Sequence, residues 1–374
     1  MYHVRARAFA LSLSLLALLL SACAAPPARA ELERLRLPDG YAIETWAKVP
    51  GARSLVVVPD LGAVLVSSRG DAIHAVRFDA ATGRAGAVVP LKRGLKVPNG
   101  IAWKDGALYV AEQHRIVRFP GTRVETLAAA RPQVLFDALP DDRWHGWRDA
   151  AFGPDGWLYV AVGAPCNICL PRGLEGTLIR LDPNGGAPQV FARGIRNSVG
   201  LAFHPETGAL FFTDNGADNM GDDSPPDELN RAETAGLHFG YPWFGGGTDR
   251  TPDFAGDTPP AGARPPVVAF GAHVAALGVH HYRGAMFPAE MRTDALVAQH
   301  GSWNRSVPDG YRVVRVHMDP DGTVRGYAPF IEGWLGPDGR AFGRPVDLAE
   351  LPDGSLLISD DRAGVLYRVT YRAP

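Results

Sequence analysis

The sequence predicts an all-β chain folded as a six-bladed β-propeller. One pattern recurs along it: a short apolar run, a turn built from Pro, Asp and Gly, and a second apolar run that ends in a polar residue. Glycine and proline, at 43 and 32 residues, are typical of a chain of 374 residues that is rich in turns. Beyond the N-terminal segment, no stretch shows a convincing 3.6-residue apolar period, so long helices are not expected.

The repeats follow one another at about 45 to 50 residues where they are regular, which is the range of propeller blades. Five clear copies contain RSLVVVPDLGAVLVSSR from residue 53, NGIAWKDGALYVAE from 99, RDAAFGPDGWLYVAV from 148, NSVGLAFHPETGALFFTD from 197 and PVDLAELPDGSLLISD from 345. A sixth, more diverged copy contains GVHHYRGAMFPAEMRTDALVAQHGSWN. A β-sandwich would also have short strands, but it would not repeat one strand-turn-strand phrase.

The N-terminus is typical of an exported protein. Arg5 and Arg7 precede an apolar run that ends in Leu20-Ser21-Ala22-Cys23 and is too short to span a membrane. This ending resembles a bacterial lipobox, which would make Cys23 the lipidated first residue, while an Ala-x-Ala site at 28–30 is an alternative cleavage point. We therefore expect a periplasmic protein that is anchored to the outer membrane by lipid alone.

Three parts of the chain follow from these patterns. Residues 1–23 form the signal peptide, 24–37 a linker and 38–374 the propeller. Within the propeller, residues 218–266 are rich in Pro, Gly and Asp and are expected to form a long loop insertion on one face. The formal net charge of -2 argues against a nucleic-acid partner.

Two cysteines remain after the signal peptide, in the segment Cys166-Asn-Ile-Cys169. Haem attachment would need His at position 170, which is Leu170, and a zinc site would need two more ligands. A pair of ligands stays open, but a disulfide that stiffens the loop is the favoured interpretation in an oxidising compartment.

Chemistry in a propeller collects at the mouth of the central channel, where the inner strands begin. The polar residues expected to face one another there are Asn99, the stretch from His145 to Arg148, Arg196, Asn197, Gly216, Arg283 and Arg305. A ring of Arg, Asn and His side chains is an environment for binding anions and transferring protons.

Several phrases of the chain resemble one known family. HGWRDAAFGPDGWLYVAVG, GTLIRLDPNG, GIRNSVGLAFHPETGALFFTDNG, DELN and HFGYP are similar to segments of the soluble, quinone-dependent aldose and sorbosone dehydrogenases, and they occur in that family's order. The resemblance covers nearly all of the mature chain. It implies a six-bladed propeller that carries pyrroloquinoline quinone (PQQ) and calcium.

The resemblance assigns roles to the cationic and polar residues. His145, eight residues before Gly153-Pro154-Asp155, matches the general base, although a solvated loop histidine is the alternative. Arg196 and Asn197 match a cofactor-contacting pair, for which the guanidinium is expected to make a two-pronged contact with a carboxylate. The remaining cofactor-side or substrate-side assignments are Arg283, Arg305 and Asn99.

The same resemblance gives the acidic loop a role in binding calcium. The carbonyl groups of Gly216 and Ala217 match calcium ligands, and Glu228 and the carbonyl of Phe239 match a further calcium position. A solvated acidic loop is the alternative. The cysteine-containing loop, and Ser198-Val199 after Arg-Asn, depart from the family pattern near the mouth and put the choice of substrate in doubt.

The expected function is that of a PQQ- and calcium-dependent sugar dehydrogenase. His145 would remove a hydroxyl proton while hydride passes to the quinone, and a cytochrome or another quinone would accept the electrons. The alternatives are a calcium-dependent lactonase on a six-bladed propeller and a non-enzymatic binding propeller of the cell envelope.

Overall fold

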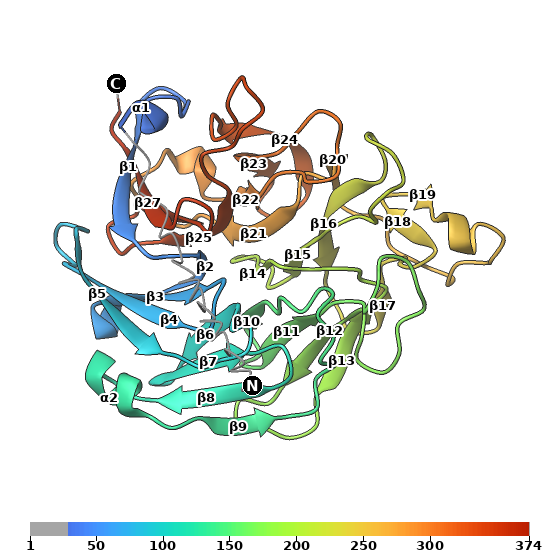
Figure 1. The fold of residues 1–374 in the computed structure, drawn as a ribbon, viewed down its shortest axis with the longest axis horizontal. Coiled ribbons are helices and arrows are strands. Elements are labelled where there is room, and N and C mark those ends of the chain that lie inside the picture. The colour runs from blue at the N-terminus through green and yellow to red at the C-terminus, as the bar shows by residue number, and fades with distance from the viewer. Residues whose placement is uncertain (1–28, 374) are drawn as a thin grey trace, which may run out of the picture.

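A computed structural model describes residues 29–373 and shows six antiparallel sheets arranged in a ring around one axis (Figure 1). The predicted six-bladed β-propeller is confirmed. The expected signal peptide, with Cys23 and the first residues of the linker, lies outside the described residues. No helix in the described part of the chain is long and apolar enough to cross a membrane.

The first three blades follow the order of the sequence from the inner strand outward. Blade 1 contains β2 (Ala52–Val58), β3 (Ala63–Ser68), β4 (Ile73–Phe78) and β5 (Ala85–Lys92). Blade 2 contains β6 (Gly100–Lys104), β7 (Ala107–Ala111), β8 (Ile116–Pro120) and β9 (Gln133–Phe136). Blade 3 contains β10 (Ala150–Phe152), β11 (Leu158–Val162), β12 (Thr177–Leu181) and β13 (Gln189–Arg193).

The last three blades complete the ring. Blade 4 contains β14 (Leu201–Phe203), β15 (Leu210–Asp214), β16 (Pro226–Ala232) and β20 (Val268–Ala272). Blade 5 contains β21 (Ala276–His281), β22 (Ala295–Gln299), β23 (Arg312–Met318) and β24 (Val324–Ile331). Blade 6 combines β25 (Pro345–Glu350), β26 (Leu356–Asp360) and β27 (Val365–Tyr371) with β1 (Tyr41–Lys48) from the start of the described chain.

Helical structure is limited to short pieces in the described residues. They are α1 (Arg29–Leu32), α2 (Val124–Ala129) and the 3₁₀ turns η1 (Pro59–Leu61), η2 (Pro252–Phe254) and η3 (Ala289–Met291). None reaches the length at which an apolar period becomes visible in a sequence, so the expectation of no long helix agrees with the fold.

The core consists of apolar layers between neighbouring blades. Six hydrophobic clusters each join side chains of two adjacent blades, including the pair formed by blades 6 and 1. The second strand of every blade is buried along its whole length. These strands read as continuous apolar runs because they are covered on both faces.

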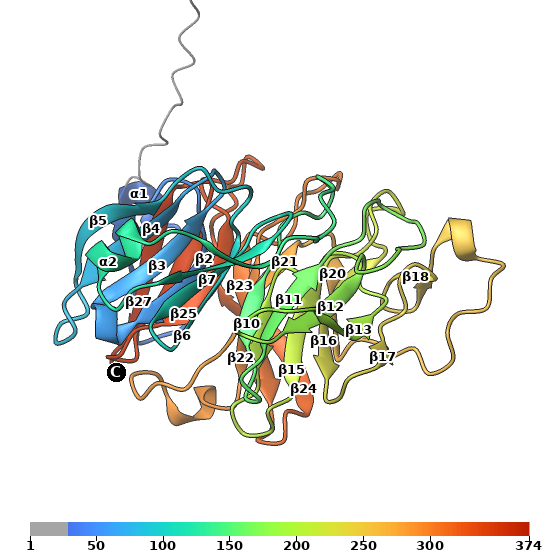
Figure 2. The same cartoon turned by 90° about the horizontal axis from the view of Figure 1, so that it is seen from below.

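The segment 218–266 differs from the single loop insertion that the sequence predicts. It includes β16, the third strand of blade 4, which carries the DELN phrase. The excursion follows this strand and holds β17 (Leu237–His238), which adds a parallel edge to blade 3, and the hairpin β18 (Phe244–Gly246) with β19 (Asp249–Arg250). Figure 2 shows β18 and the chain beyond it projecting from one side of the ring. The strand was not predicted because β16, with the sequence PDELNRA, is mostly polar and lies within a polar segment.

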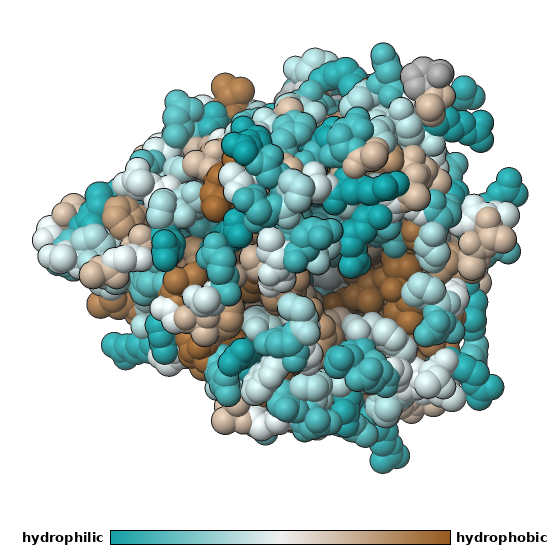
Figure 3. Space-filling model, turned by 180° about the vertical axis from the view of Figure 1, so that it is seen from behind, coloured by the Kyte–Doolittle hydropathy of each residue, from teal (hydrophilic) through white to brown (hydrophobic). Residues whose placement is uncertain are grey.

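The two ends of the inner strands open onto different cavities. One cavity is lined by residues that precede β10, β14 and β21, whereas a second, of about 450 Å³, is lined by residues of all six inner strands and by residues that follow them. The face shown in Figure 3 is hollowed near its centre, and hydrophobic residues line the hollow.

Candidate active site

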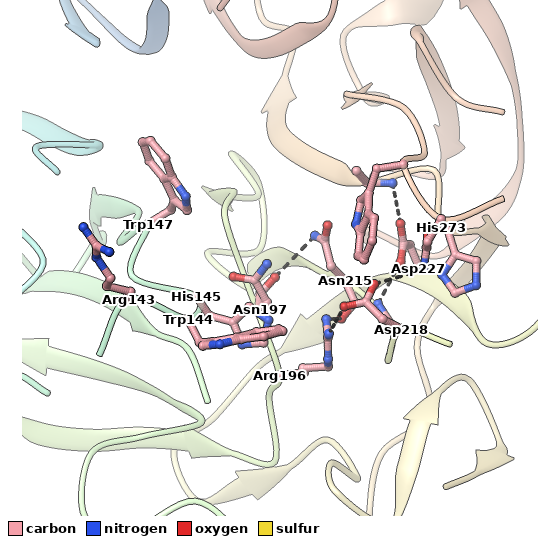
Figure 4. Close-up of a pocket in the computed structure, with 14 residues that line it drawn as sticks. Arg143, Trp144, His145, Trp147, Arg196, Asn197, Asn215, Asp218, Asp227 and His273 are labelled. Atoms are coloured by element: carbon pink, nitrogen blue, oxygen red, sulfur yellow. Dashed lines mark hydrogen bonds and ion pairs between the residues drawn. The ribbon is translucent and has the colours of Figure 1, made fainter. Parts of the chain in front are cut away.

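A cavity of about 390 Å³ lies where the inner strands begin (Figure 4). It is formed by loops of blades 3, 4 and 5, and its lining contains Arg143, Trp144, His145, Trp147, Arg196, Asn197, Asn215, Gly216, Asp218, Asp227, His273, Ala275, Trp303 and Asn304. The structure therefore brings together four residues that the sequence assigned to the site: His145, Arg196, Asn197 and Gly216.

His145 is held in one orientation by the backbone around it. Its Nδ1 atom lies 2.8 Å from the carbonyl oxygen of Ala164, so Nδ1–H donates and Nε2 carries the free lone pair. The residue has a left-handed backbone, with φ of 49°, which histidine tolerates better than most residues. A Cβ atom at Gly163 would lie 2.4 Å from the Cβ of His145, so only glycine leaves room for the histidine.

The environment of His145 favours the neutral imidazole. Burial is the main cause that lowers its pKa to about 3, and the positive charge of Arg196 is the next cause. At neutral pH the ring is therefore uncharged and presents a proton acceptor at Nε2.

Arg196 is buried and already engaged by the protein. Its guanidinium donates to Asn167 O at 3.1 Å, Asn167 Oδ1 at 2.8 Å, Asn215 O at 3.1 Å and Asp218 Oδ2 at 2.7 Å. Arginine has five N–H groups, so one N–H of the Nη1 nitrogen remains after these four bonds to described residues. The two-pronged contact expected from the sequence is therefore not available, and a single N–H is left for a ligand.

Two side-chain amide oxygens in the cavity wall lack partners. Asn197 Oδ1 and Asn304 Oδ1 are buried, and no described residue donates a hydrogen bond to either. Asn304 is held by the bond from its Nδ2 atom to Asp218 Oδ1 at 3.1 Å. Because buried polar atoms normally have partners, these two oxygens are acceptors left for an ordered water or a polar ligand.

Three buried carboxyl groups lie in or beside the cavity wall. Asp214 accepts from Arg196 N at 2.8 Å, Asp227 from Gly216 N at 2.7 Å, and Glu228 from Asn230 Nδ2 at 2.8 Å. Burial raises the pKa of Asp214 to about 7, of Asp227 to about 6 and of Glu228 to about 8. Repulsion from Asp227 adds to the effect at Asp214, and repulsion from Asp214 and Asp227 adds to it at Glu228, so this region favours the approach of a cation.

A third cavity, which is very small, adjoins this acidic region. It has a volume of about 10 Å³, close to the space of one water molecule, and its lining includes Gly216, Glu228, Phe239 and Asp214. Ala217 is the next residue in the chain, and its N–H donates to Gly245 O at 2.7 Å. The structure therefore places Gly216, Glu228 and Phe239, which the sequence assigned to two calcium positions, around one small cavity, and Ala217 next to them in the chain.

The donor set fits a hard cation that uses backbone oxygens. No group of three or more His, Cys, Asp or Glu side chains is arranged to hold a metal in the described part of the chain. No described residue donates a hydrogen bond to the carbonyl of Gly216 or of Ala217. Calcium accepts such carbonyl oxygens together with carboxylates and water. Glu228 and these two carbonyls are the residues that could hold it.

The structure does not bring Arg283 to this cavity. Arg283 follows β21 instead of preceding it, and it lines the second cavity, at the other end of the inner strands. In the diverged copy, which forms blade 5, the HHYRG phrase lies at the end of the inner strand. The sequence did not show where this strand ends.

Arg305 and Asn99 support the site from outside the cavity. Arg305 donates to the carbonyl of Asp222 and to Asp223, so it ties two loops together. Asn99 is fully buried, accepts from Arg53 Nε at 2.6 Å and donates to Arg148 O at 2.8 Å. The Arg53 guanidinium in turn stacks on the ring of Trp147, with 4.3 Å to its centroid.

Sequence reasoning missed several residues of the site. Asp218 and Asn167 hold Arg196, and Asn304 and Trp303 line the wall. Asn304 could have been predicted, because it stands beside Arg305 in the GSWNR phrase that was already assigned to the site. Nothing in the sequence linked Asn167 to Arg196. The predicted disulfide between Cys166 and Cys169 is confirmed.

Comparison with known proteins identifies relatives in sequence. The family model described as Glucose / Sorbosone dehydrogenase matches residues 108–314, more than half of the chain. An uncharacterised protein of Borreliella burgdorferi is 33% identical over 296 residues, which cover 76% of this chain and 78% of that protein.

Solved structures share the fold at lower identity. A Trichoderma reesei enzyme of Carbohydrate-Active Enzymes Family AA12 superposes with a TM-score of 0.77 at 19% identity, covering 90% of this chain and 98% of that one. The holo form of the pyranose dehydrogenase PQQ domain from Coprinopsis cinerea gives 0.75 at 19% identity, covering 90% and 97%.

Proposed function

Because the chain belongs to the glucose/sorbosone dehydrogenase family, we propose that it is a PQQ- and calcium-dependent dehydrogenase that oxidises an aldose or an aldehyde sugar. The observation that carries this proposal is the neutral His145, whose Nε2 is free and which shares a cavity with Arg196 and Asn197. A sugar dehydrogenase needs a proton acceptor beside a site for an anionic redox cofactor, and the cavity offers both.

The cofactor would be held by the polar wall of the cavity. The one remaining N–H of Arg196 is the candidate for contact with an oxygen of the cofactor, whereas Asn197 Oδ1 and Asn304 Oδ1 are acceptors and would need an N–H of the cofactor or a hydroxyl of the sugar. When bound, PQQ would supply the hydride acceptor, and calcium at the carbonyls of Gly216 and Ala217 would supply a polarising charge. The Coprinopsis domain is named for the same quinone, which supports this assignment.

His145 would accept the hydroxyl proton of the sugar at Nε2. The bond from Nδ1–H to Ala164 O fixes the ring and the tautomer, so no rearrangement is needed before proton transfer. An anionic group bound beside Arg196 would offset that residue's positive charge and so raise the basicity of His145. Cofactor binding and base strength are thus coupled through Arg196.

The rim of the cavity suits a sugar. Trp144 and Trp303 line the cavity and are 55% and 70% exposed. Indole rings present an apolar face with a polar N–H, a combination that fits the alternating C–H and hydroxyl surfaces of a pyranose. Asn304, next to Trp303 in the chain, adds an amide group to the lining.

The cellular setting extends the proposal. The Leu20-Ser21-Ala22-Cys23 ending supports export and lipid anchoring at the outer membrane, in the periplasm. There a cytochrome or a quinone would take the electrons from the reduced cofactor.

The test is reconstitution of the purified, EDTA-treated protein with PQQ and Ca²⁺. We expect sugar-dependent reduction of a dye acceptor that needs both additions, measured over a panel of aldoses, and a change of PQQ absorbance on binding. Hydrolysis of aldonolactones with Ca²⁺ alone would favour the lactonase alternative. Binding of PQQ with no turnover of any sugar would favour a non-enzymatic propeller.

A further inference from the structure

Asn167, between the two cysteines, contacts both Arg196 and Asp218, and Asp218 directly follows the candidate calcium ligands Gly216 and Ala217. Its side-chain amide pairs with the backbone of Asp218 in both directions: Asp218 N donates to Asn167 Oδ1 at 2.8 Å, and Asn167 Nδ2 donates to Asp218 O at 2.9 Å. Its Oδ1 and backbone carbonyl also accept the two bonds from Arg196. One residue therefore fixes the cation of the cavity and the loop that follows Gly216.

The loop that presents Asn167 is pinned at its base. A disulfide joins Cys166 and Cys169, so Asn167 lies inside a closed ring of four residues. The hydroxyl of Tyr241 accepts from Cys169 N at 3.1 Å and donates to Asn167 O at 3.2 Å. Tyr241 belongs to the excursion after β16, so three separate segments meet at this loop.

The local hydrogen-bond balance explains why Asn is needed here. Four of the five guanidinium N–H groups of Arg196 are engaged, and two of those bonds go to Asn167. Without the amide, the guanidinium would keep its bonds to Asn167 O, Asn215 O and Asp218 Oδ2, but its Nη2 nitrogen would be left with one acceptor instead of two. Asp218 would at the same time lose both backbone bonds to the amide, so the carboxylate that remains bonded to Nη2 would itself be held less firmly.

We propose that Asn167 is a positioning residue, and that the Cys166–Cys169 disulfide makes its grip on Arg196 and Asp218 sensitive to thiols. The inference rests on the proposed function for its effect on turnover, but not for its structural effect. A dithiol reductant would transfer two electrons and two protons to the S–S bond, leaving two thiols and the oxidised, cyclic reagent. Opening the ring would release Asn167, which would weaken cofactor and calcium binding together.

The first test measures amide hydrogen exchange in the cofactor-free protein. In Asn167→Ala, the Asp218 amide loses its acceptor, and its exchange should accelerate by about tenfold or more. The neighbouring Ala217 amide, which donates to Gly245 O, is an internal reference that should not change. Asn184→Ala, in an exposed turn of blade 3, is the matched control variant. Unchanged exchange at Asp218 in Asn167→Ala overturns the proposal, whether or not the protein oxidises sugars.

The second test treats the intact protein with dithiothreitol, followed by iodoacetamide to block reclosure. We expect faster exchange at Asp218 and an apparent dissociation constant for PQQ, from absorbance titration, raised by about tenfold or more. Asn167→Ala should raise the PQQ dissociation constant in the same way and should respond little to dithiothreitol. Asn167→Asp, which keeps the acceptor for Arg196, should rescue part of the PQQ affinity. An alkylated protein with parental exchange and affinity would reject the role of the disulfide.

A protein that fails to turn over any sugar, but whose Asp218 exchange responds as expected, would refute the proposed function and leave the positioning role intact. Parental turnover together with an Asp218 amide whose exchange does not change would support the proposed function and refute the positioning role of Asn167.

Discussion

The Nδ1 atom of His145 lies 2.8 Å from the carbonyl oxygen of Ala164, and this bond defines which ring nitrogen faces the cavity. Ala164 N in turn donates to Arg196 O at 2.8 Å, so the histidine and the arginine are tied to the same backbone segment. The proton acceptor and the cation of the site are therefore held at a fixed separation.

Replacing His145 by Asn should remove the proton acceptor without straining the backbone, because Asn also tolerates a left-handed conformation. We expect the rate of quinone reduction by sugar to fall by about 10²- to 10⁴-fold with little change in PQQ affinity. Stopped-flow absorbance of the bound quinone is the measurement, and His317→Asn on β23 is the control. A parental rate would move the role to His273, which lines the cavity. His280 lines the other cavity and His300 is bonded to Asp361, so neither is the next candidate.

The pH profile of quinone reduction should show no loss of the His145 base around pH 6.5. Because its pKa is lowered to about 3, mainly by burial, the neutral form persists as the pH falls through the usual range of histidine. An anion beside Arg196 offsets only the smaller cause, so the inflection should stay below 6.5. Single-turnover rates between pH 4 and 8 would check this, and an inflection near 6.5 that disappears in His145→Asn would contradict it.

Stability at acid pH should depend on His281. Its pKa is lowered to about 3 by burial and by the neighbouring His204, so the unfolded chain binds the proton first. The stability that this group contributes is present above pH 6.5 and is lost as the pH falls towards 3, by about 2 kcal/mol between 6.5 and 5. Both ring nitrogens of His281 lack partners among the described residues, so His281→Phe should reduce this loss and raise the free energy of unfolding at pH 5. Urea unfolding at pH 7 and pH 5 measures both, and an unchanged pH slope would refute it.

Removal of calcium should lower the melting temperature, and Glu228→Gln should abolish most of that response. Binding to the folded state at 100 times the dissociation constant contributes about 2.7 kcal/mol. Both carboxyl oxygens of Glu228 accept hydrogen bonds, from Asn230 Nδ2 and from Gly247 N, so Gln removes one acceptor and should lower the stability of the calcium-free protein by about 1–3 kcal/mol. The calcium-dependent shift of each protein is therefore the quantity to compare. Thermal melting with EDTA and with a Ca²⁺ series gives the comparison, with the exposed Glu206→Gln as control. A Glu228→Gln variant with the parental calcium shift would exclude this residue as a ligand.

Arg283→Ala should leave PQQ affinity and turnover within about twofold of the parent. The side chain lines the cavity at the opposite end of the inner strands and is not among the residues that line the candidate active site. Steady-state kinetics and the PQQ titration are sufficient. A loss as large as that of Arg196→Ala would mean that the opposite mouth takes part in the reaction.

The fold could be predicted because each blade repeats its own strand-turn-strand phrase, and the phrase reflects strands buried on both faces. The site was predictable where a residue's position relative to an inner strand decides which mouth it faces, as for His145 and Arg196. The predicted position of Arg283 was wrong, because the diverged sequence of blade 5 does not show where β21 ends. Contacts such as that of Asn167 with Asp218 depend on the paths of two separate loops, which leave no periodic trace in the sequence.

The seam of the ring has a consequence for how the protein is made. Strand β1 pairs with β27 from Tyr41↔Tyr371 to Lys48↔Val365, and Arg53 and Asp361 form a buried ion pair at 3.0 Å, 308 residues apart. During synthesis, β1, the first described strand, therefore has an unpaired edge until β27 has left the ribosome. Pairing between strands so distant in sequence is intrinsically slow. During that interval the unpaired strand is exposed to other chains. A chain that stopped short of β27 would leave this edge permanently unpaired, so proteolytic trimming of the C-terminus should convert the closed ring into an aggregating species.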